Sequence, residues 1–283
     1  MNQPMRWWID GVEGEALIPN ERMLQYGDGL FETLVVRDGE IGYLERHMQR
    51  LQAGCSRLGI TIPDPDGLVE TLMCRAGEAQ EAVLKVMLGR SGAGRGYAVP
   101  EHAGVKCIVS LYPLKQWPEV HREQGVRVRI CETRLATQPV LAGIKHMNRL
   151  EQVLARREWN SGYEEGLMLD YNDRVIEGTM TNIFLVKQGG VFTPALEQCG
   201  VAGVMRSVVL DLADAMDMPV TVESIGRNEL LMADEVFLCN SVIGVWPVAS
   251  IESGHQMGVG PISRKLMQGL DSRQTPVPGC WRT

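Results

Sequence analysis

Three ionisable side chains lie in short strings of glycine, polar and apolar residues. Lys145 lies in the string Gly-Ile-Lys-His-Met-Asn-Arg-Leu, which begins at residue 143. Glu177 lies in Val-Ile-Glu-Gly-Thr-Met-Thr-Asn-Ile-Phe, which begins at residue 175, and Arg50 lies in His-Met-Gln-Arg-Leu, which begins at residue 47. An amine can act as a nucleophile or base, a carboxylate as a base or charge partner, and a guanidinium group as an anion binder. These residue types indicate an enzyme without fixing its reaction.

Glycines mark two further strings. Tyr-Gly-Asp-Gly-Leu-Phe-Glu begins at residue 26, and Gly-Val-Ala-Gly-Val-Met-Arg begins at residue 200. The second string predicts a helix that begins at Gly203, and the first N–H groups of a helix attract anions. Gly92, Gly94 and Gly96 form another glycine-rich stretch, but it lacks the spacing of a dinucleotide-binding loop and the acidic residue that would follow it.

The periodicity of apolar residues predicts the elements that position these strings. Apolar residues repeat at helical spacing from Leu44 to Leu58, which predicts a helix that carries Arg50. A strand over residues 30–37 runs into a hairpin turn at Asp38-Gly39. Further strands are expected over residues 6–11, 82–88, 105–111, 126–131, 165–170, 175–176, 182–186, 191–193, 220–223 and 235–239, and further helices over residues 68–76, 149–159, 203–215, 228–232 and 262–270.

The composition limits the kind of protein. The 283 residues are 45% hydrophobic and 22% charged, which is typical of soluble globular proteins, and the net charge of −7 argues against a nucleic-acid binder. No apolar run is long enough to span a membrane, and the first residues do not have the pattern of a signal peptide. Five histidines without metal-ligand spacing give no metal site, and seven scattered cysteines indicate reduced thiols in a cytoplasmic protein.

Taken together, the five strings resemble the class-IV aminotransferase family of pyridoxal 5'-phosphate enzymes. They occur in the family's order and cover essentially the whole chain, and five ordered motifs are a strong signal where one would be weak. The resemblance implies an α/β enzyme of the two-domain fold type IV. We expect a smaller N-terminal α/β domain over residues 1–113, a linker over 114–124, and a larger cofactor-binding domain over 125–283 with a barrel-like mixed sheet.

The resemblance also implies which residues bind the cofactor. Lys145 matches the lysine that forms a Schiff base with pyridoxal 5'-phosphate and later moves protons. Glu177 matches the carboxylate that keeps the pyridine nitrogen protonated, and Arg50 matches the arginine that binds the phosphate. Further phosphate contacts are expected from the helix start after Gly203 and from a hydroxyl group: Val204, Met205 and Ser241.

Within the family, the string that contains Lys145 looks most like the 4-amino-4-deoxychorismate lyases of folate biosynthesis. D-Amino-acid aminotransferases usually have a tyrosine where this chain has Phe31, and an Arg-x-His motif where it has Arg95-Gly-Tyr. The resemblance therefore implies a carbon–oxygen lyase that converts 4-amino-4-deoxychorismate to p-aminobenzoate and pyruvate. A D-amino-acid or (R)-amine aminotransferase and a non-catalytic binding protein on the same fold are the alternatives.

In the lyase reaction, the substrate amine would replace Lys145 on the cofactor and form an external aldimine. The freed lysine would remove the proton at C4 of the substrate and then protonate the departing enolpyruvyl group. Because the substrate carries two carboxylates, the site should offer further cations and polar groups. The candidate substrate-binding residues are Arg95, Tyr97, Phe31 and Asn240.

The expected partners follow from the same resemblance. Family members are typically homodimers, so a homodimer is expected here. The only other partner expected is the small-molecule substrate, with neither nucleic acid nor a membrane.

Overall fold

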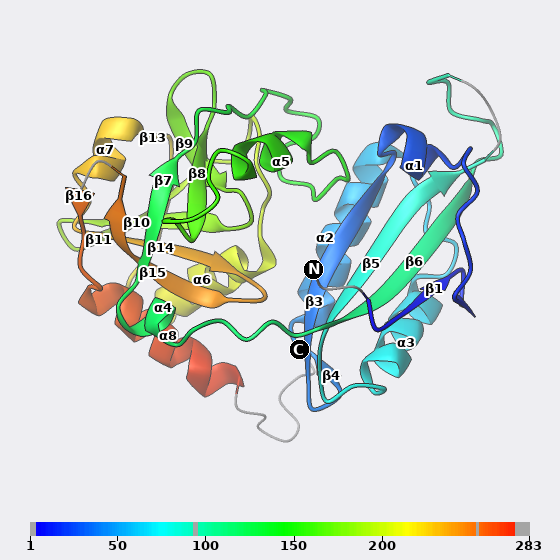
Figure 1. Cartoon of the computed structure of the whole chain (residues 1–283), viewed down its shortest axis with the longest axis horizontal. Helices are drawn as coiled ribbons and strands as arrows, with labels where there is room; N and C mark the ends of the chain where they lie inside the picture. The colour runs from blue at the N-terminus through cyan, green and yellow to red at the C-terminus, as the bar shows by residue number, and fades with distance from the viewer. Residues whose placement is uncertain (1–3, 93–95, 253–254, 275–283) are drawn as a thin grey trace. The chain divides into compact units, whose positions relative to one another are not determined.

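The computed structural model describes residues 4–92, 96–252 and 255–274 and divides into two compact units (Figure 1). The first unit contains Met1–Gln116 and the short segment Ile144–Arg149. The second contains Trp117–Gly143 and Leu150–Thr283. The predicted linker over residues 114–124 spans the point where the first unit ends. The predicted domain boundaries stay a prediction, and they did not include the return of six residues to the first unit.

An antiparallel sheet of six strands forms the first unit, in the order β2-β1-β6-β5-β3-β4. Buried and half-buried side chains alternate along β3, as expected where one face of a sheet is covered by helices. Asp38 and Gly39, both with positive φ, form the predicted turn between β3 and β4. The strands are β1 (Arg6–Ile9), β2 (Val12–Glu13), β3 (Gly29–Arg37), β4 (Glu40–Ile41), β5 (Glu81–Ser91) and β6 (Gly104–Pro113).

Among its described residues, the first unit has three helices: α1 (Arg22–Tyr26), α2 (Leu44–Leu58) and α3 (Pro65–Ala76). Helix α2 has the predicted bounds and packs on β3. A Cβ at Gly54 of α2 would stand 2.7 Å from a methyl group of Leu30, so glycine allows this close approach. Helix α3 begins three residues before its predicted start because Asp64 accepts the N–H of Gly67 and Pro65 occupies the first helical position.

A mixed sheet of ten strands forms the second unit. Nine strands follow the order β12-β11-β10-β14-β15-β7-β8-β9-β13, and β16 pairs with β15. The pairs β11 with β12, β15 with β7, and β7 with β8 are parallel, and the others are antiparallel. The strands are β7 (Val126–Ile130), β8 (Glu165–Leu169), β9 (Arg174–Gly178), β10 (Asn182–Lys187), β11 (Gly190–Pro194), β12 (Val220–Glu223), β13 (Ile225–Gly226), β14 (Glu235–Asn240), β15 (Gly244–Ile251) and β16 (His255–Gln256).

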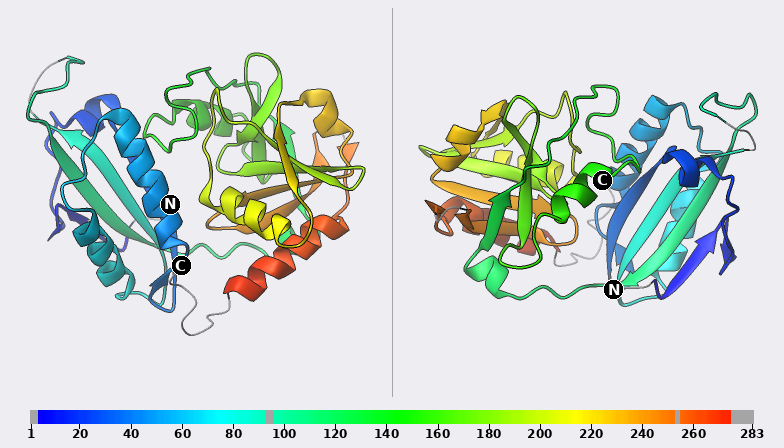
Figure 2. Two further views of the ribbon diagram at one scale, coloured as in Figure 1. Left: turned by 180° about the vertical axis from the view of Figure 1, so that it is seen from behind. Right: turned by 45° about the horizontal axis from the view of Figure 1, so that its top comes forward.

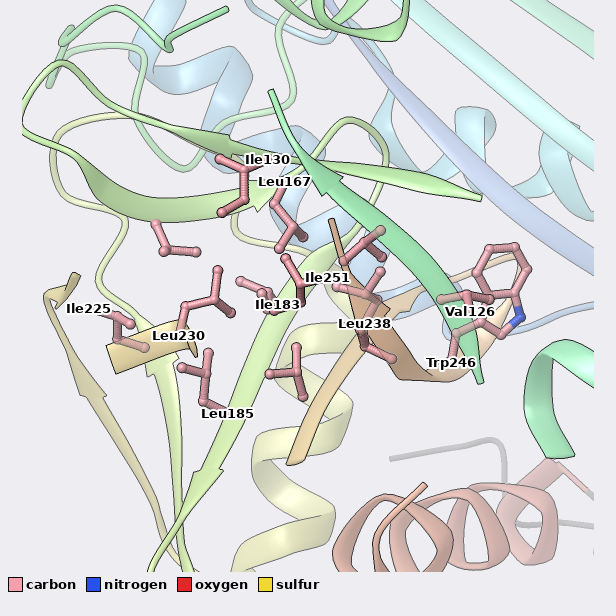
Figure 3. Packing of buried hydrophobic residues seen from close by; sticks show 14 of the residues in the cluster. Val126, Ile130, Leu167, Ile183, Leu185, Ile225, Leu230, Leu238, Trp246 and Ile251 are labelled. Atoms are coloured by element: carbon pink, nitrogen blue, oxygen red, sulfur yellow. The ribbon is translucent and has the colours of Figure 1, made fainter. Parts of the chain in front are cut away.

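This sheet curls on itself, because β9 comes back beside β10 and β11. Figure 3 shows the apolar cluster that fills its interior, including Val126, Leu167, Ile183 and Trp246. Helices α6 and α8 lie side by side and pack on β14, as Figure 2 also shows. The helices are α4 (Val120–Glu123), α5 (Leu150–Arg156), α6 (Val204–Asp214), α7 (Arg227–Leu231) and α8 (Pro261–Gln274). Among the described residues, no helix has the length and apolar character needed to cross a membrane.

Two of the differences between the second unit and the sequence prediction have a clear physical reason. The sequence analysis missed β15, because Pro247 breaks its apolar run and proline normally argues against a central strand. The structure tolerates Pro247 because the ladder between β15 and β7 begins one residue later, at Val248. The helix expected over 149–159 ends at Arg156. Beyond it, the carboxylate of Glu158 accepts the backbone N–H groups of residues 132 and 133 instead of continuing a helix.

Candidate active site

Lys145 belongs to a short segment that is hydrogen-bonded to the start of β3. The N–H of Phe31 donates to the carbonyl oxygen of Lys145 at 3.0 Å, and the N–H of Met147 donates to the carbonyl oxygen of Gly29 at 2.9 Å. A Cβ at Gly29 would stand 2.4 Å from the carbonyl oxygen of Leu88, so only glycine fits between the two neighbouring segments. The backbone of Lys145 is therefore fixed by β3, and its side chain is half-buried.

The residues after Lys145 explain why its string has this sequence. Asn148 Nδ2 donates to the carbonyl oxygen of Gly27 at 3.3 Å, and a Cβ at Gly27 would stand 2.8 Å from Asn148 Oδ1. Arg149 Nε donates to the carbonyl oxygen of His146 at 2.8 Å. The glycine string from residue 26 and residues 144–149 of the lysine string therefore fold against each other within the first unit.

Two lysine side chains approach the ring of Phe31. Lys145 Nζ lies 4.5 Å from the ring centroid, and Lys85 Nζ lies 5.0 Å from it, both within the range of a cation–π contact. In the pairing of β3 with β5, Phe31 lies opposite Met87 and Thr33 lies opposite Lys85, so these side chains share one face of the sheet. The sequence analysis assigned Phe31 and Lys145 to the site and missed Lys85.

Lys85 has the properties of a group that binds an anionic ligand. Burial lowers the pKa of its ammonium group. Within the part of the chain that the structure describes, the ammonium group has the ring of Phe31 as a neighbour but no hydrogen bond or ion pair. A desolvated cation without a charged partner is costly unless a ligand supplies one. One sequence signal was available, because Lys85 is the single charged residue in the apolar string Val-Leu-Lys-Val-Met-Leu.

Arg50 lies on α2, one turn after His47, and both side chains meet Glu32 of β3. Arg50 Nε donates to Glu32 Oε1 at 2.7 Å, and Arg50 Nη2 pairs with Glu32 Oε2. His47 Nδ1 lies 2.7 Å from Glu32 Oε2. The side chains of Glu32 and His47 are each 1% exposed, whereas that of Arg50 is 12% exposed. The predicted phosphate arginine is thus held by a carboxylate inside the first unit.

The protonation states of this cluster follow from opposing effects. Burial raises the pKa of the Glu32 carboxyl, but hydrogen bonds from His47 and Arg50 outweigh burial and leave the pKa below its ordinary value. Burial lowers the pKa of His47 despite the nearby carboxylate, and the charges of Arg50 and Lys145 add to this shift. Glu32 is therefore a carboxylate at neutral pH, and a neutral His47 donates its Nδ1–H to that carboxylate.

Glu177 is a buried residue of β9 in the second unit. The N–H of Val201 donates to Glu177 Oε2 at 2.8 Å. Gly200, with φ of 87°, lets this loop come close, because a Cβ there would stand 2.7 Å from Ile176 Cγ2 and 2.9 Å from Leu196 Cδ2. The loop also bonds to Gly143, whose N–H donates to the carbonyl oxygen of Gly200 at 2.9 Å. Gly143 is two residues before Lys145 in the sequence.

A second buried carboxylate shapes the turn that follows Glu177. Glu165 accepts hydrogen bonds from Thr179 Oγ1 at 2.5 Å, from the N–H of Met180 at 3.1 Å and from Thr181 Oγ1 at 3.1 Å. Burial raises the pKa of Glu165 although these donors oppose the shift. The sequence analysis did not single out Glu165, because its partners become neighbours only when β8 pairs with β9.

Helix α6 begins at Val204, as predicted, with Gly203 as its N-cap. No side chain caps this end within the described chain, and its first turn holds no acidic residue. The side chains of Val204 and Met205 are buried, so their backbone N–H groups are the groups that can bind a ligand. Asn182 holds the preceding loop, because its Nδ2 donates to the carbonyl oxygen of Val201 at 2.8 Å.

Asn240 and Ser241 form a turn between β14 and β15. Asn240 Oδ1 accepts the N–H groups of Val242 and Ile243 at 2.8 and 2.9 Å, and Asn240 Nδ2 donates to the carbonyl oxygen of Met180 at 3.0 Å. The oxygen and the nitrogen of the Asn240 amide therefore both form hydrogen bonds with the backbone. The predicted contact of Asn240 with substrate stays a prediction. Ser241 is half-buried in this turn.

The glycine-rich loop of the first unit contains two predicted substrate contacts. Arg95 lies outside the described residues. Tyr97 is 85% exposed, and its ring centroid lies 5.4 Å from that of Tyr26. Arg22 fixes the backbone here, because its guanidinium group donates to the carbonyl oxygens of residues 96, 97 and 98 at 3.1, 3.3 and 3.2 Å. Arg22 is itself paired with Asp28 at 2.9 Å.

Residues 29–251 match the amino-transferase class IV family, and the chain belongs to this family. The resemblance read from the five strings is therefore confirmed. Two similar proteins share a more specific name. The aminodeoxychorismate lyase of Vibrio harveyi is 36% identical over 270 residues, which are 94% of this chain and 100% of that protein. The crystal structure of 4-amino-4-deoxychorismate lyase from Pseudomonas aeruginosa is 46% identical, with a TM-score of 0.92 over 95% of this chain and 99% of that chain.

A more distant structure shares the fold. The crystal structure of the branched-chain amino acid aminotransferase of Escherichia coli is 24% identical and has a TM-score of 0.86 over 99% of this chain and 98% of that chain. At this identity, the likeness shows the fold alone. With the lyase structure, it confirms the predicted fold class.

Proposed function

We propose that this chain is a pyridoxal 5'-phosphate-dependent aminodeoxychorismate lyase, which converts 4-amino-4-deoxychorismate to p-aminobenzoate and pyruvate in folate biosynthesis. The observation that carries the proposal is the 46% identity with a solved lyase of this name across nearly the full length of both chains. The position of Lys145 supports it, because hydrogen bonds to β3 fix the backbone of this lysine.

The donor groups of the chain fit pyridoxal 5'-phosphate, which has an aldehyde, a ring nitrogen and a phosphate. Lys145 offers a primary amine for the aldehyde, and the buried carboxylate of Glu177 would keep a ring nitrogen protonated. The uncapped first turn of α6, described above, and the guanidinium group of Arg50 suit a phosphate dianion. The hydroxyl of Ser241 would add a further phosphate contact.

When bound, the cofactor would supply an electron-accepting ring that stabilises negative charge on the carbon next to the substrate amine. Lys145 would take the proton from C4 of the substrate and return it to the enolpyruvyl group as the carbon–oxygen bond breaks. The lysine amine would then end in the state in which it began. The atoms of the substrate divide between p-aminobenzoate and pyruvate without another reactant.

Substrate binding requires groups that accept two carboxylates. Lys85 is the best-placed candidate among the described residues, because its half-buried ammonium group approaches the same ring of Phe31 as Lys145. Arg95 and Tyr97, in the glycine-rich loop, remain candidates for the other carboxylate. Phe31 would then contact both lysine side chains and define one wall of the substrate position.

A coupled assay for pyruvate and p-aminobenzoate tests the proposal. The purified protein should release both products from 4-amino-4-deoxychorismate without any added keto acid. Lys145→Ala should lose at least about 10²-fold in rate, the usual contribution of a general acid–base group. Turnover that depends strictly on a keto acid would identify an aminotransferase instead. Unchanged activity in Lys145→Ala would overturn the proposed role of this lysine.

We also propose that the protein is a cytoplasmic homodimer. The six described cysteines are free thiols, which fits a reducing compartment. Helix α5 exposes three apolar side chains: Leu150 is 76% exposed, Val153 53% and Leu154 50%. Neighbouring apolar side chains that remain exposed in one chain are typical of a protein–protein interface.

A further inference from the structure

The cluster of Glu32, His47 and Arg50 contains a buried carboxylate for which the proposed chemistry has no direct use. Glu32 lies on β3, next to Phe31 in sequence but on the opposite face of the strand. Its carboxylate accepts hydrogen bonds from Arg50 Nε at 2.7 Å and from Arg50 Nη2. It also accepts a hydrogen bond from His47 Nδ1 at 2.7 Å. Both Glu32 and His47 are 1% exposed.

The stability of the fold is by itself a weak explanation for the buried ion pair of Glu32 and Arg50. Removing a carboxylate and a guanidinium group from water has a large cost, and buried ion pairs are often no more stabilising than apolar residues of the same volume. The side chain of Arg50 is also the least buried of the three, at 12%. The arrangement therefore places the fixed carboxylate inside and the arginine towards the outside of the cluster.

The form of the contact restricts how Arg50 can point. Nε and Nη2 form one side of the planar guanidinium group, and both donate to the two oxygens of a single carboxylate. An arginine side chain without such a contact has several rotatable bonds and no preferred direction. Two parallel hydrogen bonds to Glu32 use two of its five N–H donors and fix the plane of the group.

We infer that Glu32 is a positioning residue for Arg50: it holds the guanidinium group in the orientation in which Arg50 binds the cofactor phosphate, and His47 in turn holds Glu32. This inference rests on the proposed function, because it needs Arg50 as a phosphate-binding group. In this role Glu32, which is 1% exposed, would act through Arg50 rather than by direct contact with cofactor or substrate. Its negative charge would oppose a phosphate, so any benefit must come from orientation rather than from attraction.

The affinities of the full-length protein for pyridoxal 5'-phosphate and for pyridoxal, which lacks the phosphate, test this inference. Each is titrated into cofactor-free protein and followed by absorbance. Glu32→Gln should weaken binding of pyridoxal 5'-phosphate by about tenfold or more, the worth of a charge-assisted hydrogen bond, while the affinity for pyridoxal stays nearly unchanged. Glu32→Asp, which keeps the carboxylate, should retain more of the preference for the phosphate.

Arg50→Lys and the double variant complete the test. Arg50→Lys should reduce the preference for pyridoxal 5'-phosphate over pyridoxal. Adding Glu32→Gln to Arg50→Lys should reduce this preference little further, because both substitutions act through one contact. Glu235→Gln is the matched control: Glu235 is a buried carboxylate of the second unit that accepts three hydrogen bonds from Ile262 and Ser263. It should alter thermal stability without changing the preference for the phosphate.

The outcomes separate this inference from the proposed function. If Arg50→Lys lowers the preference and Glu32→Gln does not, Glu32 has no positioning role. If Glu32→Gln weakens the binding of pyridoxal 5'-phosphate and of pyridoxal equally, Glu32 has a merely structural role. If Glu32→Gln binds pyridoxal 5'-phosphate more tightly, the repulsion between the Glu32 charge and the phosphate outweighs the effect of orientation. If Glu32→Gln does not fold, the test uses Glu32→Asp and His47→Leu. Each of these should lose a smaller part of the preference for pyridoxal 5'-phosphate over pyridoxal. A wild-type protein that binds neither ligand would overturn the proposed function itself.

Discussion

Lys85 and Lys145 approach the same aromatic ring, yet the chain holds them in different ways. Lys145 lies in a segment hydrogen-bonded to β3, whereas Lys85 is an interior residue of β5. The position of Lys145 in its string gave the sequence analysis a clear candidate. The approach of Lys85 to Phe31 depends on the pairing of β3 with β5, so it could not be predicted from local sequence spacing.

Replacing Lys85 with methionine keeps most of the length of the side chain and removes its charge. The KM for 4-amino-4-deoxychorismate should rise about 10- to 100-fold, because a hydrogen bond to a charged group is worth about 1.5–3 kcal/mol, and kcat should change little. Steady-state kinetics of pyruvate release measure both constants. Lys106→Met is the matched control, since Lys106 on β6 pairs with Asp10 at 2.6 Å. An unchanged KM in Lys85→Met would rule out this carboxylate contact.

His146 gives the folded protein a defined response to acid. Burial, helped by the charges of Arg149 and Lys145, lowers the pKa of His146 from 6.5 to about 4. Between these two values the unfolded chain binds a proton that the folded chain does not, so stability should fall as the pH drops from 6.5 towards 4. His146→Gln should flatten this part of the profile in urea unfolding measured at several pH values.

A residual slope is expected in His146→Gln, because the pKa of His47 is lowered in the same direction. A slope identical to that of the wild-type protein would show that His146 takes up its proton equally in both states.

At the level of elements, the sequence predicts what local periodicity controls. Helix α2 and strand β12 have the predicted bounds, since each has a regular pattern between clear end signals. The sequence analysis missed β15, because Pro247 interrupts its apolar run and because its pairing with β7 joins residues far apart in the chain. The network around Glu165 was missed for the same reason: its donors follow β9, whereas the carboxylate lies on β8.

The N-cap position of α6, Gly203, should not tolerate a side chain. A Cβ at Gly203 would stand 2.0 Å from Asn182 Oδ1, so Gly203→Ala must displace Asn182 and its hydrogen bond to Val201. We expect a loss of about 1–3 kcal/mol in the free energy of unfolding and weaker binding of pyridoxal 5'-phosphate. Thermal unfolding and absorbance titration measure these changes.

Gly226→Ala provides the comparison for this element. Gly226 is the N-cap of α7, and a Cβ there would first meet the carboxylate of Glu229 at 3.6 Å, an ordinary contact distance. This variant should leave both stability and cofactor binding close to those of the wild-type protein. Equal effects in the two variants would show that the loss reflects N-cap glycine in general rather than the contact with Asn182.

At the scale of the whole molecule, the exposed apolar side chains of α5 predict self-association. Leu154→Glu should shift a dimer towards monomer at micromolar concentration, because a charged group would have to be buried in the interface. Analytical ultracentrifugation measures the change. Met73→Glu is the control, since Met73 on α3 is exposed to a similar extent, at 57%. A wild-type protein that is monomeric at these concentrations would contradict the proposed dimer.

The return of Ile144–Arg149 to the first unit also has a consequence for solubility. In the described chain, β4 pairs with β3 at Val36 and Arg37 only, so the other end of β3 would be an open sheet edge. The segment that carries Lys145 covers this edge through its bonds at residues 29 and 31. An open edge is a template for pairing with other chains. The six residues that include Lys145 therefore also cover the open edge of the sheet, so a substitution that loosens their backbone should reduce soluble yield as well as the proposed activity.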